Sequence, residues 1–301
     1  MTTLPSVSVV VPVLNAAPTL HQCLLSLLRT DYPSERREIV VVDNGSTDSS
    51  REIAAALPVV LVEESRRGAA AARNRGVEAS HGAILAFTDA DCVVTAGWLH
   101  ELVRAFDNDA VAAVEGRIVA YPPATPAERY AALTGSHSRE RRSAGTSPGY
   151  VVTANVALRR EVFRRIGLFD TRFPGAGGED VDFSWRFSQE PDFELRYAPK
   201  AVVFHRHRAT AWGLFSQRVN YGYGRALLHG KYPGQSAWGW RQEWEGYRSL
   251  ARTAWHLART VFGGRAPGNR GSIGDLSLSL VAGLGHRIGF ARGLLVRGGR
   301  R

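Results

Sequence analysis

The chain has 301 residues, 44% of them hydrophobic and 22% charged, which suits one large α/β core and excludes a disordered or collagen-like chain. Its two cysteines, Cys23 and Cys92, exclude a disulfide framework and a four-thiolate zinc site, and they indicate a reducing compartment. Residues 1–15 show no basic segment followed by a cleavage site, so we expect no secretory signal and a cytoplasmic location.

Basic charge is concentrated towards the end of the chain. Residues 196–301 hold 18 Lys and Arg against three Asp and Glu, a net charge of +15, whereas residues 1–195 carry a net charge of −5. A basic tail on a mildly acidic body predicts contact with an anionic partner. Nucleic acid, a phospholipid surface and a phosphorylated substrate all fit this charge.

The first 90 residues alternate between strand and helix patterns. Apolar runs predict buried strands at 7–13, 38–42, 58–62 and 83–87, and helical spacing predicts helices at 20–28, 49–57 and 68–79. Such alternation is typical of βαβ units in a parallel sheet. Polar residues follow three of the strands, so we expect them to converge at the carboxyl edge, where ligands bind in such sheets. These residues are Asn15, Asp43, Asp89 and Asp91.

The second part of the chain is less regular. It predicts a helix at 98–106, a strand at 111–119, a polar stretch at 121–149 with a mobile loop at 135–149, helices at 159–166 and 183–187, and extended chain at 194–204. From Trp212 onwards the sequence is helical, aromatic and basic.

The longest apolar segment, Leu276–Val296, is interrupted by Arg287 and Arg292, so we do not expect it to span a membrane. Its apolar residues form one helical stripe. The stripe fits an interfacial helix on an anionic membrane, and it equally fits a helix packed on the preceding part of the chain or on a second subunit.

Asp89 and Asp91 form an acidic pair at the end of an apolar strand. Hard oxygen ligands in such a place suit Mg²⁺ or Mn²⁺, which commonly bind one or two carboxylates together with substrate phosphates. The pattern is short, and Asp91 equally fits the N-cap of a following helix.

Five ordered motifs resemble family 2 glycosyltransferases of the GT-A fold: VSVVVPVLN at 7–15, VVDNGSTD at 41–48, RNRG at 73–76, FTDAD at 87–91 and GEDVDFSWR at 178–186. The resemblance covers roughly residues 5–225. It implies a nucleotide-sugar donor, a divalent metal and inversion at the anomeric carbon.

The resemblance also implies roles for the donor side. Pro12 and Asn15 would lie in the loop that accommodates the nucleoside, and Asp43 would accept a hydrogen bond from the base or ribose. Arg73 would lie beside the diphosphate, where a guanidinium offers bidentate hydrogen bonds. Ordinary structural explanations stay open, namely an Asx turn for Asp43 and a solvated helix face for Arg73.

In the metal site that the resemblance implies, Asp91 binds the ion directly, Asp89 contacts the ribose or a metal-bound water, and His205 reaches back to the ion. An imidazole ligand favours Mn²⁺ over Mg²⁺. His207 is the competing histidine, and a structural role for either one is the alternative.

The acidic pair Glu179 and Asp180 matches the family residues in which an Asp deprotonates the acceptor hydroxyl. We assign Asp180 as the general base and Glu179 as its neighbour and an acceptor contact. Two adjacent carboxylates repel, which raises the pKa of one of them and makes it a better base. Capping of the following helix is the alternative role.

We therefore expect a GT-A type α/β fold with a mostly parallel, Rossmann-like sheet. A catalytic domain would span 1–225, with a nucleotide-binding half at 1–110 and an acceptor half at 111–225, followed by a basic helical extension at 226–301. The chain lacks the Gln-x-x-Arg-Trp signature of processive synthases, which favours addition of a single sugar.

The expected partners are a nucleotide-diphosphate sugar and a hydroxyl acceptor, which is lipid-linked, a glycan or a small molecule. The inner face of the plasma membrane and a second copy of the chain are open as further partners, and no nucleic acid is expected. One alternative is a nucleotidyltransferase-like enzyme, although residues 13–20 lack the glycine and basic residues of its phosphate loop. The other is a non-catalytic protein that binds anionic surfaces or nucleic acid.

Overall fold

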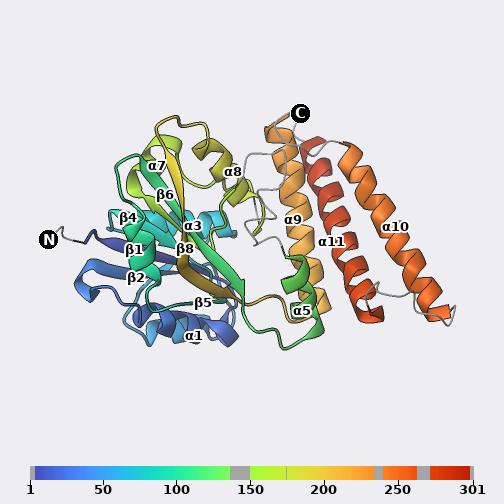
Figure 1. The fold of residues 1–301 in the computed structure, drawn as a ribbon, viewed down its shortest axis with the longest axis horizontal. Helices are drawn as coiled ribbons and strands as arrows, with labels where there is room; N and C mark the ends of the chain where they lie inside the picture. Colours follow the sequence, from blue (N-terminus) through green and yellow to red (C-terminus); the bar gives the residue numbers. More distant parts are fainter. Residues whose placement is uncertain (1–3, 136–149, 174, 234–239, 263–271, 299–301) are drawn as a thin grey trace.

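The computed structural model describes residues 4–298 apart from 136–149, 174, 234–239 and 263–271 (Figure 1). It has one eight-stranded sheet in the order β3-β2-β1-β4-β7-β6-β8-β5, with a row of three long helices beside it. The predicted α/β class is confirmed.

The first half of the sheet is parallel. β1 pairs with both β2 and β4, and β2 also pairs with β3. Alternate residues of β1 point to opposite faces, so Val9 and Val11 pack on the side of α1 while Val10 packs on the side of α3. The predicted βαβ units are present. Their elements are β1 (Val7–Val13), α1 (Ala17–Leu28), η1 (Ser34–Arg36), β2 (Arg37–Asp43), α2 (Ser50–Ala55), β3 (Val60–Glu63), α3 (Ala69–Ala79) and β4 (Ile84–Phe87).

The second half of the sheet is mixed. β7 runs antiparallel to β4 and β6, β6 runs parallel to β8, and β5 runs antiparallel to β8. Four of the seven strand pairings between described residues are parallel. The elements are β5 (Cys92–Val94), α4 (Trp98–Arg104), β6 (Val111–Ala120), α5 (Pro126–Thr134), β7 (Val156–Arg159), α7 (Arg160–Ile166), α8 (Glu179–Phe187) and β8 (Glu194–His205).

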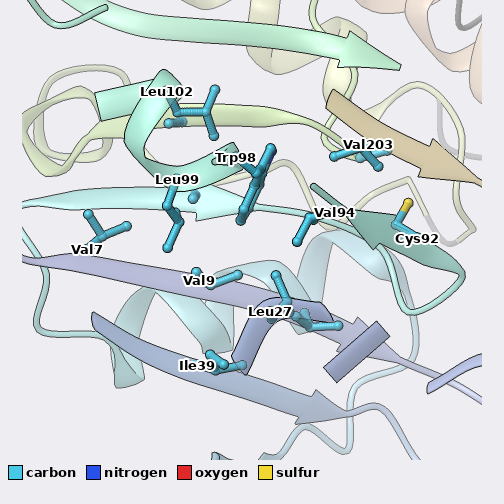
Figure 2. Packing of buried hydrophobic residues seen from close by; sticks show 14 of the residues in the cluster. Val7, Val9, Leu27, Ile39, Cys92, Val94, Trp98, Leu99, Leu102 and Val203 are labelled. Carbon is cyan, nitrogen blue, oxygen red and sulfur yellow. The ribbon is translucent and has the colours of Figure 1, made fainter. Parts of the chain in front are cut away.

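One face of the sheet packs against α1 and α4. Trp98 of α4 is fully buried there beside Val9, Leu99 and Leu102 (Figure 2). Its indole N–H donates to Asn155 Oδ1 at 2.8 Å, so the polar atom of this large side chain is satisfied inside the core. Replacing such a buried aromatic side chain by alanine lowers the free energy of unfolding by about 3–5 kcal/mol, so this core contributes strongly to the stability of the sheet.

Among the elements that were not expected are α5 and β5. α5 lies within the predicted polar stretch, where Pro126 opens the helix and Thr125 and Glu128 form a capping box. β5 follows Asp91 directly, so Asp91 does not precede a helix and does not act as an N-cap. Residues 136–149 of the predicted mobile loop lie outside the described residues.

Three helices form the end of the described chain, namely α9 (Ala211–Lys231), α10 (Trp240–Phe262) and α11 (Ile273–Gly298). α11 lies between the other two (Figure 1). A side-chain carbon added at Gly289 would lie 1.9 Å from the carbonyl oxygen of Val219, so the backbones of α9 and α11 touch at this glycine. The predicted domain boundary after residue 225 lies inside α9, and the division into domains stays a prediction. None of the described helices has the length and apolar character needed to cross a membrane.

Candidate functional site

The loops after β1 and β2 are joined at the carboxyl edge of the sheet, as predicted. Asn15 has a left-handed backbone (φ 51°), and its Oδ1 accepts the N–H of Thr47 at 2.8 Å. Its own N–H donates to Ser46 Oγ at 3.0 Å. Asp43 Oδ1 accepts the N–H of Ser46 at 3.1 Å, three residues on, whereas an Asx turn would use the N–H of Gly45, two residues on. Contact of Asn15 and Asp43 with a nucleoside stays a prediction.

Asp48 and Pro12 lie close to these loops. Asp48 accepts the N–H of Ala17 and that of Ser50, each at 3.0 Å, so one carboxylate caps the first turns of α1 and α2. Pro12 lies inside β1, opposite Val42 of β2, and not in the loop where the resemblance placed it. This correction leaves its contact with the nucleoside as a prediction.

Arg73 of α3 joins the end of β4 to the start of α8. Its guanidinium donates to Asp89 Oδ1 at 3.0 Å and to Glu179 Oε1 at 2.8 Å. The Arg73 side chain is 4% exposed, which rules out the solvated helix face. Burial acts against its charge, but the two carboxylates outweigh burial and raise the pKa of Arg73. Arg73 therefore holds together the two acidic motifs of the sequence, and its contact with a diphosphate stays a prediction.

Two asparagines fix the helix that carries Arg73. Asn44, which is buried, donates from Nδ2 to the carbonyl oxygens of Glu64 and Arg66 and accepts the N–H of Gly68, all at 2.8–2.9 Å. These bonds set the loop that leads into α3. Asn74 exchanges two hydrogen bonds of 2.9 Å with the backbone of Phe169, which ties α3 to the segment before α8.

Asp180 lies in the first turn of α8, next to Glu179. Burial and the charge of Glu179 raise the pKa of Asp180 to about 7, and the positive charge of Arg73 opposes that rise. The Glu179 carboxylate accepts from Arg73 and from the N–H of Gly177 at 2.7 Å, and these two bonds fix it beside Asp180. A carboxyl group with such a pKa can take up a proton near neutral pH.

Asp91 and His205 meet across the pairing of β5 with β8. Cys92 lies opposite His205 in that register, which brings the preceding residue, Asp91, to the imidazole. His205 Nε2 lies 3.5 Å from Asp91 Oδ1, and the Asp91 carbonyl accepts the N–H of Arg206 at 3.0 Å. Ligand atoms of Asp91, Cys92 and His205 all lie within 4.8 Å of one another. This donor set suits a divalent ion of borderline softness.

The other two candidates near this pair differ from His205. Burial, followed by the charges of Asp91 and Asp89, raises the pKa of the Cys92 thiol well above its usual range, so Cys92 offers a neutral thiol and not a thiolate. Burial and the charge of His205 lower the pKa of His207 to about 4. The structure brings His205, and not His207, to Asp91.

A glycine-rich loop before α8 packs against α9. A side-chain carbon at Gly175 would lie 2.8 Å from Asn220, and one at Gly177 would lie 2.9 Å from Tyr221. Burial, with the charge of Asp180 as a further cause, raises the pKa of Tyr221. The first long helix of the basic region therefore forms part of the surroundings of Asp180.

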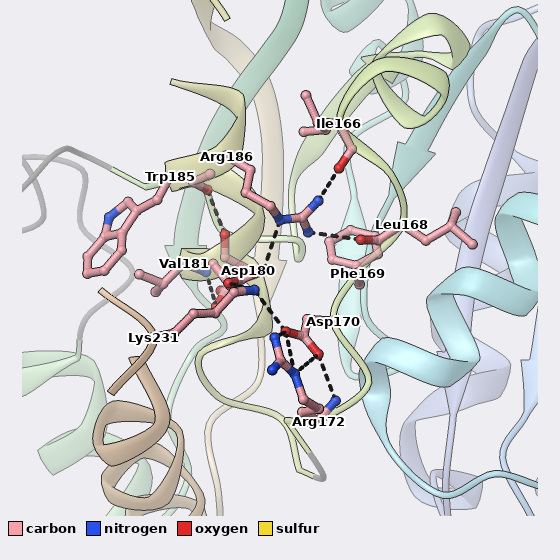
Figure 3. A network of polar contacts seen from close by, with 12 residues as sticks. Ile166, Leu168, Phe169, Asp170, Arg172, Asp180, Val181, Trp185, Arg186 and Lys231 are labelled. Carbon is pink, nitrogen blue, oxygen red and sulfur yellow. Dashed lines mark hydrogen bonds and ion pairs between the residues drawn. The ribbon is translucent and has the colours of Figure 1, made fainter. Parts of the chain in front are cut away.

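Further along, Lys231 of α9 holds α8 from the other side. Its ammonium lies 2.5 Å from Asp182 Oδ1 and 2.8 Å from Asp170 Oδ2. Asp182 is fully buried and also accepts from Arg186 Nε at 3.0 Å. Burial would raise the pKa of Asp170, but hydrogen bonds from Arg172 and Lys231 outweigh it and hold that pKa well below its usual range. Figure 3 shows Arg172 and Lys231 meeting at Asp170, and Arg186 reaching the backbone carbonyls of Ile166 and Leu168.

The sequence did not single out Lys231, Asn44, Asn74 or the pairing of Asp182 with α9. The spacing of Asp182 and Arg186, one helical turn apart, is a signal that could have predicted their ion pair. Lys231 is one of two lysines in a chain that otherwise uses arginine, which is a weak signal.

With this geometry in place, comparison with known proteins identifies the family. The sequence model described as Glycosyl transferase family 2 matches residues 8–167, which is more than half of the chain. The chain belongs to glycosyl transferase family 2. It is therefore a glycosyltransferase, and the two alternative functions are set aside. Asp180 and His205 lie beyond the matched residues, so their roles are argued below as proposals.

Two relatives support the assignment. The glycosyltransferase AglE of Haloferax volcanii is 35% identical over 214 residues, which cover 68% of each chain. The pre-mycofactocin glycosyltransferase of Mycobacterium tuberculosis is 34% identical over 240 residues, which cover 77% of this chain and 49% of that protein. This chain therefore spans about two thirds of the first relative and half of the second.

Solved structures of glycosyltransferases share the fold. The mannosyltransferase PcManGT of Pyrobaculum calidifontis, in complex with GDP-Man and Mn²⁺, has a TM-score of 0.56 at 24% identity and covers 100% of this chain and 77% of its own. Glucosyl-3-phosphoglycerate synthase of Mycobacterium tuberculosis, in complex with Mn²⁺, UDP and phosphoglyceric acid, has a TM-score of 0.55 at 21% identity and covers 75% of this chain and 78% of its own. These likenesses show the GT-A type fold.

Proposed function

We propose that this family 2 glycosyltransferase transfers a single sugar, with inversion, from a nucleotide-diphosphate sugar to a hydroxyl acceptor. The observation that carries the proposal is the Asp180 carboxyl group, whose pKa lies near 7. Its neighbour Glu179 accepts a hydrogen bond from Arg73, and Arg73 also donates to Asp89 in the acidic motif after β4. The fold neighbours in complex with GDP-Man or UDP support a nucleotide-linked donor.

Asp91 and His205 would hold a divalent metal ion. A carboxylate and an imidazole 3.5 Å apart fit Mn²⁺ better than Mg²⁺, and the two named neighbours carry Mn²⁺. When bound, such an ion neutralises the charge of a leaving diphosphate. Asp89, tied to Arg73, would sit beside the donor and contact the ribose or a water on the ion.

Asp180 would act as general base. The acceptor hydroxyl attacks the anomeric carbon, its proton passes to the Asp180 carboxylate, and the bond from that carbon to the diphosphate oxygen breaks. Attack from the face opposite the leaving group inverts the anomeric centre. The Arg73–Glu179 ion pair would fix the start of α8 and so position Asp180.

The acceptor would approach past the loop 175–178 and α9, which surround Asp180. We propose a hydroxyl of a lipid-linked molecule, because the basic region that borders the acceptor side carries the net charge of +15. Glycans and small molecules are the other acceptors to be assayed.

Asp180→Asn tests the proposal. The variant should lose about 10²–10⁴-fold in turnover, the usual contribution of a general base, while the dissociation constant of the donor stays within a few-fold. Asp31→Asn, at an exposed carboxylate on the connection after α1, is the matched control and should behave like the wild type. Nucleoside diphosphate release with a panel of nucleotide sugars and Mn²⁺ gives the readout. A collapse of donor affinity in Asp180→Asn would instead place this carboxyl in the metal or nucleotide site.

A further inference from the structure

α10 presents a row of large aromatic side chains to solvent. Trp244, Trp255 and Phe262 are 68%, 57% and 88% exposed. Intervals of 11 and seven residues correspond to about three and two helical turns, so the three side chains lie on one face of the helix. Exposed apolar residues that recur on one face mark an interaction surface. We call these three residues the aromatic row.

Three exposed arginines border the aromatic row. Arg248 lies four residues after Trp244, and Arg252 and Arg259 lie three before and four after Trp255. The Arg259 guanidinium lies 5.3 Å from the Trp255 ring centre. From Tyr247 to Phe262 the sequence holds these three arginines and no acidic residue, so this face is apolar with a positive border.

The opposite face of α10 packs against α11. A side-chain carbon at Gly246 would meet the Arg287 guanidinium of α11, and one at Gly283 of α11 would lie 2.7 Å from Leu250. Arg287 also lies 4.9 Å from the Tyr247 ring centre. α10 is the outermost of the three helices (Figure 1), so within the described part of the chain its aromatic row faces outward.

The structure also changes the place that the sequence suggested for membrane contact. The predicted stripe runs along α11, but α11 is the central helix and its glycine positions touch α9. Leu284, Ile288 and Leu295 of the stripe stay exposed, but they are aliphatic, and the nearby Arg287 lies against the Tyr247 ring of α10.

We propose that the aromatic row of α10 docks on an anionic lipid bilayer, with Arg248, Arg252 and Arg259 over the headgroups. Tryptophan and phenylalanine partition into the interface between headgroups and acyl chains, and arginines at its border gain from negative lipid charge. The net charge of +15 in residues 196–301 complements such a surface. Because part of the attraction is between arginines and anionic headgroups, membrane binding weakens as the salt concentration rises.

Co-sedimentation with vesicles tests this surface. The full chain should bind vesicles of phosphatidylcholine with phosphatidylglycerol, bind phosphatidylcholine alone far more weakly, and be released by high salt. Replacing Arg248, Arg252 and Arg259 by Gln should reduce partitioning into anionic vesicles on the order of 100-fold. Trp255→Ala with Phe262→Ala should reduce it roughly tenfold or more.

Matched controls separate this face from general charge and aromaticity. Arg36, Arg104 and Arg164 are exposed on other elements, and their joint replacement by Gln removes the same charge. Trp212 of α9 is 73% exposed, and Trp212→Ala removes an aromatic residue elsewhere. Both controls should bind like the wild type. Failure of the wild type to bind anionic vesicles, or equal binding by the α10 variants, overturns the proposal. So does a wild-type dimer that Trp255→Ala with Phe262→Ala converts to monomer without altering vesicle binding, since a second copy would then cover the row.

Discussion

Two groups of carboxylates flank the candidate active site, and they differ in what opposes their charge. Asp91 faces the imidazole of His205 and the neutral thiol of Cys92, whereas the buried Asp182 is paired with the ammonium of Lys231 and the guanidinium of Arg186. A carboxylate opposed by imidazole and thiol can still give its charge to a metal ion, while one opposed by fixed cations is already neutralised. Both groups contain carboxylates, and they differ in the side chains that face them. The surroundings of Asp91 therefore suit a metal ion, whereas the ion pairs of Asp182 stabilise the fold.

Asp91→Asn is the most severe test of that difference. If Asp91 holds the metal ion, the variant should lose roughly 10³-fold or more in turnover, because the leaving diphosphate would no longer be neutralised. Its melting temperature should stay close to that of the wild type, since Asp91 is not held by fixed cations. Steady-state kinetics with added Mn²⁺ and a thermal melt measure the two effects. Full turnover of the wild type in EDTA would contradict the metal role.

The two histidines sharpen the comparison. His205→Ala should weaken Mn²⁺ binding about 100-fold, whereas His207→Ala should change it only a few-fold, because His205 Nε2 lies 3.5 Å from Asp91 Oδ1 and His207 is not part of the ligand cluster found among the described residues. Calorimetric titration of each variant with Mn²⁺ gives both values. Equal losses in the two variants would mean that the metal site extends to His207.

Lys231→Met tests the ion pairs around Asp182. The variant leaves Asp182 buried with less counter-charge, so we expect a loss of about 2 kcal/mol in the free energy of unfolding and about tenfold in kcat. Lys200→Met, at the other, exposed lysine, is the matched control. Urea unfolding and kinetics check both variants. If Lys231 positions α8, Lys231→Arg should restore most of kcat with little change in KM.

The smallest expected effect concerns Asp180 and stability. Its pKa is about 7 in the folded chain and about 4 in the unfolded chain, so the folded state binds the proton more tightly. The contribution of Asp180 to stability is therefore lost as pH rises from about 4 to about 7. Asp180→Asn lacks this loss and should melt a few degrees above the wild type at pH 8, with a smaller difference at pH 5. A difference that does not grow with pH would refute the raised pKa.

The sequence predicted the first half of the fold closely, because its signals are local. The run at 7–13 is a strand with the same limits as β1, Asp89 lies just past β4 as expected, and Asp43 is the last residue of β2, one position earlier than expected. Continuous apolar runs and short connections leave few arrangements other than a parallel sheet. The three-residue β5 is too short for such a signal, and the direction of β7 depends on contacts distant in sequence.

The sequence predicted which residues belong to the candidate site better than it predicted which of them contact one another. The motifs identified Arg73 and Glu179, but the bond between them joins residues 106 positions apart and needs the folded sheet. The same holds for Lys231, whose partners lie on another helix. In the tail, periodicity alone could not show which face of each helix is covered, so the exposed row on α10 was missed.

The order of the three long helices in space has a consequence for how the chain folds during synthesis. α11 packs on both α9 and α10, yet it is the last of the three to be made. Until α11 has left the ribosome, α9 and α10 lack their shared neighbour, and the inner face of α10 is as uncovered as its aromatic row. A nascent chain at that stage exposes two faces of α10, and such exposed surface makes an incompletely folded chain more prone to aggregation.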